Sequence, residues 1–287
     1  MRNLRWLLFA GLATLCTNAL ADAPRASTAG PRVEIVTDAP VLPSVGAART
    51  LRIHLPPGYH TSDRRYPVLY MFDGQNLFDA ATSYAGEWGV DEAMDALAVD
   101  AGFEAIVVGI DHGNERRINE LVPFDNAKLA PNEGVAFVRD VAEIVKPWVD
   151  AHYRTRPDRA HTAILGSSLG GLSAAYAIHA HPGVFGKAGV FSPSFWVSAQ
   201  AFAQARGPLP DDARIWLSMG GREGRQAVRD VRRYAKVLGE ARAPAQWTLR
   251  IDPKAEHDEA AWRGAFPRAV RWLFALGDAP ATDAKNR

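Results

Sequence analysis

A serine that stands between two glycines is the residue whose surroundings point most directly to chemistry. The stretch Gly166-Ser167-Ser168-Leu169-Gly170 contains the pattern G-x-S-x-G, centred on Ser168. An apolar segment of strand length precedes it and a helical pattern follows it, which is the context of a nucleophile elbow. The turn is so tight that the positions two before and two after the nucleophile have no room for side chains. The pattern therefore predicts Ser168 as a nucleophile, and a simple helix-capping turn is the alternative.

A serine hydroxyl is a weak nucleophile, so a base must take its proton and an acid must orient that base. When the serine lies on such an elbow, the acid and then the histidine follow it along the chain. Three histidines lie downstream of Ser168, and two of them, His179 and His181, end the helix that the elbow opens. His257 instead lies in a loop between the last predicted strand and the last predicted helix. We expect His257 to be the base.

The orienting acid should follow a strand that lies between the serine and the histidine in sequence. Residues 214–219 form such a predicted strand, and Glu223 comes after it in the sequence Gly-Gly-Arg-Glu. We expect Glu223 to be the acid, with Asp252 and Asp258 as the alternatives. An acid in the first turn of the next helix would be the structural explanation for Glu223.

An ester hydrolase of this kind also needs two backbone amides that bind the developing oxyanion. The residue directly after the nucleophile, Leu169, should supply one amide. The second should come from the loop that follows the predicted strand 66–72, where Gly74 allows a turn and the amide of Gln75 can point inward.

Strand and helix patterns alternate along most of the chain, which indicates crossover connections and a mainly parallel sheet. The segment 49–55 alternates polar and apolar residues as an edge strand does, whereas 66–72 is apolar throughout, as in a strand buried on both faces. Further strands are predicted at 33–37, 103–110, 161–165, 187–191, 214–219 and 246–251, and helices at 86–98, 133–153, 169–180, 226–238 and 258–276.

Several motifs in fixed order resemble one family. The segments YPVLYMFDGQNLF, GIDHGNERRINEL, GSSLGG, FSPSFW and GGREG, followed by His257, are similar to the putative esterase (esterase D-like) family of α/β-hydrolases, which includes feruloyl, acetyl-xylan and siderophore esterases. The resemblance covers about residues 49–276. It implies an α/β-hydrolase fold, with a mostly parallel central sheet and helices on both faces.

The resemblance also implies a site for carboxylic ester hydrolysis through an acyl-enzyme. Its implied triad is Ser168, Glu223 and His257, with the oxyanion amides of Gln75 and Leu169. The acid is a departure, because many α/β-hydrolases use Asp where this chain has Glu223.

The resemblance places residues 192–196 near the acyl or alcohol pocket. We expect three aromatic side chains to line an aromatic pocket or else to pack in the core: Trp88, Phe195 and Trp196. Arg117 and Glu120 match a recurring R-x-x-E stretch to which the sequence assigns no role.

The first 21 residues read as a signal peptide, with a basic start, an apolar run from Trp6 to Leu15, and an Ala-Leu-Ala cleavage site. We expect a leader at 22–48, a hydrolase domain at 49–287, and a periplasmic or secreted location. Cleavage after Ala21 removes two of the 33 basic residues and none of the 32 acidic ones, which leaves a net charge of −1. It also removes Cys16, the one cysteine, so the mature chain has no disulfide or thiolate site.

The expected partner is a small-molecule or polysaccharide-linked ester, without nucleic acid and without stable membrane insertion after signal cleavage. We expect no cofactor and no metal, because the histidines lack the spacing of metal-ligand motifs. Two alternatives use the same residues. One is an acyltransferase on the same triad, and the other is an inactive relative that binds glycans or siderophores.

Overall fold

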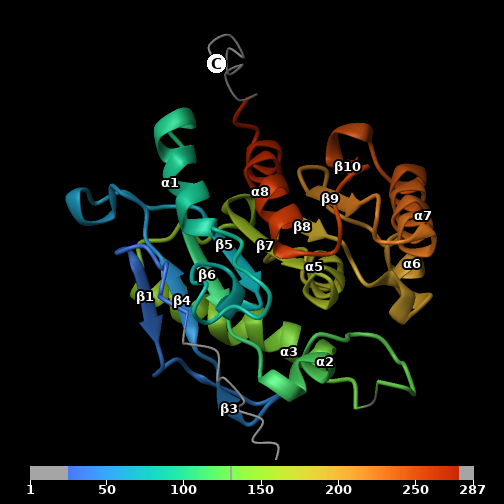
Figure 1. Cartoon of the computed structure of the whole chain (residues 1–287), viewed down its shortest axis with the longest axis horizontal. Coiled ribbons are helices and arrows are strands. Elements are labelled where there is room, and N and C mark those ends of the chain that lie inside the picture. Colours follow the sequence, from blue (N-terminus) through green and yellow to red (C-terminus); the bar gives the residue numbers. More distant parts are fainter. Residues whose placement is uncertain (1–24, 130, 278–287) are drawn as a thin grey trace, which may run out of the picture.

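The computed structural model describes residues 25–129 and 131–277, and its centre is a mostly parallel sheet (Figure 1). Within the described residues the sheet has eight strands in the order β1-β4-β6-β5-β7-β8-β9-β10. Their bounds are Val33–Val36 (β1), Leu51–His54 (β4), Val68–Phe72 (β5), Ile106–Ile110 (β6), Thr162–Ser167 (β7), Lys187–Phe191 (β8), Arg214–Gly220 (β9) and Trp247–Asp252 (β10). A separate two-stranded sheet joins Val41–Leu42 (β2) to Ala47–Ala48 (β3).

The position of strand β4 in the sheet differs from the sequence prediction. The alternation in 49–55 suggested an edge strand, but β4 lies between β1 and β6 and pairs antiparallel with both. The edge is β1, which comes from the leader segment and pairs Val33 with His54. The strands from β6 through β10 are parallel, as the alternation of strands and helices predicts.

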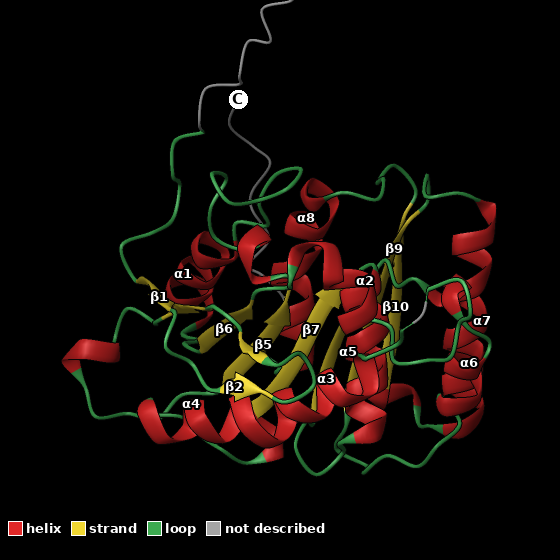
Figure 2. Cartoon of the chain, turned by 90° about the horizontal axis from the view of Figure 1, so that it is seen from below, coloured by secondary structure: helices red, strands yellow, loops and turns green. Residues whose placement is uncertain are grey.

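Helices cover both faces of the sheet, and this confirms the predicted α/β-hydrolase architecture (Figure 2). One face carries Val90–Ala101 (α1) and Glu259–Leu273 (α8); the other carries Gly134–Asp140 (α3), Lys146–His152 (α4), Leu169–Ala180 (α5), Gln200–Gln204 (α6) and Arg225–Ala241 (α7). Strands β5 to β8 are buried throughout because helices pack on both their faces. No helix in the described ranges has the length and apolarity to cross a membrane.

The predicted helix 133–153 is one helical segment with a local irregularity. A π-helical turn, Val141–Val145, separates α3 from α4. Pro147 stands in the first turn of α4. Proline has no N–H and cannot make the α-helical hydrogen bond to the residue four before it, which explains a widened turn at this point. The loop 111–131 also contains the one-turn helix Arg117–Glu120 (α2).

Trp88 packs in the interior between the sheet and α8. Its side chain is 2% exposed, and its ring lies 5.0 Å from that of Phe191 and 5.6 Å from that of Trp262, measured between ring centres. Of the two expectations for Trp88, core packing is therefore correct and pocket lining is wrong. The predicted signal peptide, 1–21, lies outside the described residues.

We expect Trp88→Ala to lower the free energy of unfolding by about 3–5 kcal/mol, because the change opens a cavity in a packed core. Urea denaturation measures this loss. Tyr84→Ala is the control, since that side chain is 88% exposed and its removal should change stability by less than about 0.5 kcal/mol. A loss below about 1 kcal/mol for Trp88→Ala would contradict the placement of this residue in the core.

Candidate active site

The turn between β7 and α5 has the geometry of a nucleophile elbow. Ser168 has φ 56° and ψ −119°, a backbone conformation that is costly for a residue with a side chain. A Cβ added to Gly166 would lie 2.5 Å from the carbonyl carbon of Gly170, and one added to Gly170 would lie 3.1 Å from Cβ of Phe72. The close approach expected at both glycine positions is therefore present. The Ser168 N–H donates to the Phe191 carbonyl at 3.0 Å, which ties the turn to β8.

Glu223 and His257 are hydrogen-bonded at 2.6 Å between Oε2 and Nδ1. The Glu223 carboxylate is 3% exposed, and the His257 side chain is 44% exposed. The other carboxylate oxygen, Oε1, accepts from the Gly220 N–H at 2.6 Å and from the Ser192 hydroxyl at 2.5 Å. Hydrogen bonds to an ionised group are stronger than neutral ones, so these contacts fix the carboxylate beside the imidazole.

Ser192 is a residue that the sequence analysis did not single out. Its hydroxyl donates to Glu223 and accepts from the indole N–H of Trp262 at 2.9 Å. The Trp262 ring also stands edge-on to the His257 ring, with centres 5.2 Å apart and planes at 87°. The acid, the histidine and α8 are thus connected through one buried hydroxyl. The available signal was the position of Ser192 directly after β8, at the carboxyl edge where the other site residues emerge.

The serine and the Glu223–His257 pair lie at the carboxyl edge of one parallel sheet, where Ser168 follows β7 and the pair follows β9 and β10. Phe191 accepts from the backbone of Ser168, and the next residue, Ser192, donates to Glu223. The Ser168 hydroxyl lies 3.3 Å from the Ser194 hydroxyl. Among the described residues there is no direct hydrogen bond from Ser168 to His257.

The other candidate acids and histidines do not contact the Glu223–His257 pair in the described part of the chain. Asp252 accepts from the backbone of Lys254 at 2.9 Å, and Asp258 caps α8 by accepting from the Ala261 N–H at 2.8 Å. His179 lies on α5, where burial and the charge of Arg242 lower its pKa to about 3. Burial also lowers the pKa of His181. Of the predicted acids, Glu223 is the one that contacts His257.

The loop after β5 brings a second backbone donor to the same edge of the sheet. Asp73 has the left-handed φ of 61°, and Gly74–Asn76 forms one turn of 3-10 helix. A Cβ on Gly74 would lie 2.8 Å from the carbonyl carbon of Gly109, so only glycine fits. Within the described ranges, the backbone N–H groups of Gln75 and Leu169 have no hydrogen-bond acceptor. Both amides are therefore available donors.

The side chain of Gln75 holds this loop against the next one. Its Nε2 donates to the His112 carbonyl at 3.2 Å, and its Oε1 accepts from the His112 N–H at 3.1 Å. This pairing resembles the hydrogen bonding of two adjacent strands, and it limits rotation of the Gln75 backbone.

The contacts of Arg117 and Glu120 explain the R-x-x-E stretch. Its guanidinium makes two parallel hydrogen bonds of 2.7 Å to the two carboxylate oxygens of Asp73. Burial opposes the charge on Arg117, but Asp73 prevails and raises the pKa of Arg117. Glu120 is fully buried, accepts from the Gly113 N–H at 2.8 Å and pairs with Arg49. The stretch thus braces the loop that presents Gln75.

Glu259 lies in the first turn of α8, directly after the loop that carries His257. Its side chain is buried, and burial raises the pKa of this carboxyl.

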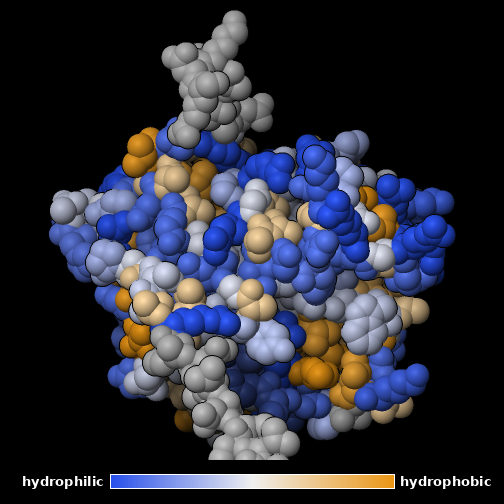
Figure 3. Space-filling model, viewed as in Figure 1, coloured by the Kyte–Doolittle hydropathy of each residue, from blue (hydrophilic) through white to orange (hydrophobic). Residues whose placement is uncertain are grey.

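The three aromatic candidates have different environments. Phe195 is 2% exposed and stacks on Tyr234 with ring centres 4.2 Å apart, so it is a core residue and not a pocket residue. Trp88 is also in the core. Trp196 is 62% exposed and follows Ser194 closely in the chain. Figure 3 shows an apolar patch, surrounded by hydrophilic residues, over α2 and the loop that follows it.

The site contains no arrangement of metal ligands. The described part of the chain has no group of three or more His, Cys, Asp or Glu side chains placed to hold a metal ion. The groups that the site does provide are a hydroxyl on a strained turn, a carboxylate-bound imidazole and two available amides.

Comparisons with known proteins identify several relatives of this chain. The family model described as "Putative esterase" matches residues 43–273. The iron(III) salmochelin esterase of Escherichia coli is 27% identical over 240 residues, 77% of this chain and 53% of that protein. An endo-1,4-beta-xylanase/feruloyl esterase of Xylanibacter ruminicola is 25% identical over 80% of this chain and 30% of its own length. The chain thus spans about half or less of these two relatives, whereas an uncharacterized Bacillus subtilis protein, YbbA, is 26% identical and is covered over 92% of its length.

Solved structures show the same fold. An IroE-like serine hydrolase from Shewanella oneidensis superposes with a TM-score of 0.67 at 18% identity, over 85% of this chain and 79% of that one. A ferulic acid esterase from Anaeromyces mucronatus gives a TM-score of 0.68 at 18% identity, over 85% and 91%. The family match spans most of the sequence, and the chain therefore belongs to the "Putative esterase" family of α/β-hydrolases and is a serine ester hydrolase.

Proposed function

We propose that the chain hydrolyses carboxylic esters through an acyl-enzyme on Ser168, with His257 as the base and Glu223 as the orienting acid. The observation that carries this proposal is the 2.6 Å hydrogen bond between Glu223 and His257 at the sheet edge where the elbow presents Ser168. A carboxylate bound to Nδ1 leaves Nε2 of the neutral imidazole as the proton acceptor.

The reaction then runs in two halves. His257 takes the Ser168 proton as the serine oxygen attacks the ester carbonyl, and it gives that proton to the departing alcohol. Water attacks the acyl-enzyme with His257 again as base, and the carboxylic acid leaves. The Ser168 hydroxyl must turn from Ser194 toward His257 for this step. Catalytic hydrogen bonds are often long in structures without substrate.

The amides of Gln75 and Leu169 are the proposed oxyanion donors. Both lack an acceptor within the described ranges, and Leu169 also starts α5, whose N-terminus favours negative charge. Arg117 and Gln75 fix the loop before substrate arrives, and donors that need no reorganisation stabilise the transition state most.

We infer that the substrate is an ester found outside the cytoplasm and that it carries an apolar or aromatic group. The relatives named as salmochelin esterase and feruloyl esterase support this inference, as do the exposed ring of Trp196 and the apolar patch over α2 (Figure 3). The signal-like residues 1–21 support a periplasmic or secreted location. Product analysis with an added alcohol acceptor separates hydrolysis from acyl transfer.

Ser168→Ala should lower turnover of p-nitrophenyl acetate by about 10⁴ to 10⁶, because the nucleophile is lost. Initial rates measure this effect, and an unchanged thermal midpoint serves as the folding control. The same substitution should abolish labelling by a fluorophosphonate probe. Near-normal turnover in the variant would refute the assignment of the nucleophile.

Ser192→Ala should lower kcat about tenfold and leave KM nearly unchanged, because Glu223 loses one of its charge-assisted hydrogen bonds. Steady-state kinetics measure both constants. Ser198→Ala removes a hydroxyl whose one hydrogen bond among the described residues is with the Gln200 backbone N–H, and this variant should behave as the wild type. Equal kcat values for the two variants would show that Ser192 does not position the acid.

Arg117→Lys should lower kcat by about 10- to 100-fold, although it keeps the charge, because an ammonium cannot form the paired contact with Asp73. Arg206→Lys is the matched control, since Arg206 pairs with Glu240 at the surface, away from the site. Kinetics of both variants with one ester substrate provide the comparison. If the Arg117→Lys variant kept the wild-type kcat, the contact between Arg117 and Asp73 would not be needed to position the oxyanion donor.

A further inference from the structure

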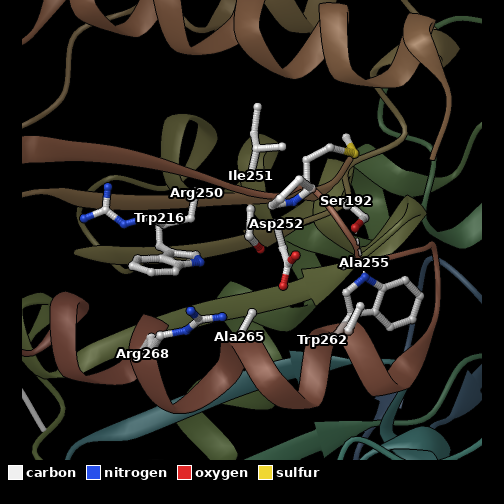
Figure 4. A pocket seen from close by; sticks show the side chains of 14 residues that line it. Ser192, Trp216, Arg250, Ile251, Asp252, Ala255, Trp262, Ala265 and Arg268 are labelled. Atoms are coloured by element: carbon white, nitrogen blue, oxygen red, sulfur yellow. Dashed lines mark hydrogen bonds between the residues drawn. The ribbon is translucent and has the colours of Figure 1, made fainter. Parts of the chain in front are cut away.

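A groove lies between α8 and the last two strands, on the side of the sheet that also carries α1. Two adjoining cavities of about 330 and 430 Å³ form it, and both are lined by Trp216, Arg250 and Arg268. Figure 4 shows Arg250 from the strand side and Arg268 from the helix side, with the Trp216 ring between them. Cavities of this size suit a small ligand or one unit of a larger one.

The sheet topology creates this groove. Strand β10 is the last strand of the sheet, and α8 packs on β8 and β9 but not closely on β10. Arg250 of β10 pairs in register with Ser218 of β9, which lies on the same face as Trp216. The side chain of Arg250 therefore extends into space that α8 leaves uncovered.

The groove is strongly cationic. Arg268 and Arg271 stand one turn apart on α8, and Arg214 and Arg250 come from the two strands. In the described part of the chain, the side chains of these four arginines make no hydrogen bond and no ion pair. Asp252 is the acid of the lining, and its carboxylate already accepts from the Lys254 backbone. Four guanidinium groups so close together repel one another, and a bound anion would relieve that repulsion.

The groove also has flat aromatic surfaces. Trp216 is 3% exposed and lines both cavities, and its indole N–H has no acceptor among the described residues. Trp272 lies beside it, with ring centres 6.2 Å apart, and the Arg214 guanidinium stacks 4.2 Å from the Trp272 ring centre. Indole and guanidinium planes both stack on ring systems.

We propose that this groove binds a carboxylate carried on a ring, either an aromatic acid or a uronic acid unit of a polysaccharide. Guanidinium groups recognise carboxylates through paired hydrogen bonds, and the partly exposed Trp272 supplies an apolar surface beside them for the ring. The whole chain has a formal net charge of only +1, which favours a small anionic group over nucleic acid as the ligand. This proposal stands independently of the triad.

Ligand binding by the full-length chain tests the proposal, with benzoate and galacturonate as the two probes and benzamide and galactose as their neutral counterparts. Arg268→Gln/Arg271→Gln removes two groove cations that point from the helix surface. Arg206→Gln/Arg229→Gln removes the same charge from exposed positions elsewhere. We expect titration calorimetry to show binding of at least one acid, with a Kd at least tenfold higher for the groove variant and unchanged for the control.

Which acid binds identifies the source of the ligand. Arg250→Gln is the second variant, since it alters the groove from the strand side, and thermal midpoints verify that each variant folds. Four results overturn the proposal: no binding of either acid, equal binding of the neutral counterparts, equal weakening in the groove and control variants, or tighter binding of single-stranded DNA through the same arginines. Because the Ser168→Ala variant should bind the acids normally, failure of this proposal and failure of the esterase mechanism are distinguishable.

Discussion

The close approach of two glycines at the end of β7 is the constraint on which the site depends. Gly166 and Gly170 come so near each other that a Cβ on Gly166 would lie 2.5 Å from backbone. This contact lets the strand turn directly into α5 and forces Ser168 to a positive φ.

The parallel strands place the remaining groups of the site near this turn. The acid follows β9, the histidine follows β10 and the second amide follows β5, so all of them emerge at the carboxyl edge. Buried polar contacts then fix their orientation. Ser192 joins Glu223 to Trp262 of α8, and Arg117 joins α2 to Asp73 of the loop after β5. Each of these side chains is held by a partner from a distant part of the chain.

The same topology explains why a second cationic region can exist beside the hydrolase site. A sheet that ends at β10 leaves one face of its last strand without a helix, and the arginines of α8 and β10 meet there. One end of this groove includes Ser192 and Trp262 (Figure 4), which also contact the acid and the histidine.

Local pattern determined the strands, the main helices, the elbow and the sites of Glu223 and His257, because hydrophobic period and glycine spacing report directly on backbone geometry. Only the tertiary structure decided the roles of Ser192 and Arg117, since both act through residues more than 30 positions away. It also decided that β1 and not β4 forms the edge, and that Trp88 and Phe195 belong to the core while Trp196 is exposed. Burial of an aromatic ring depends on which elements pack over it, and the local sequence around the ring does not show which elements these are.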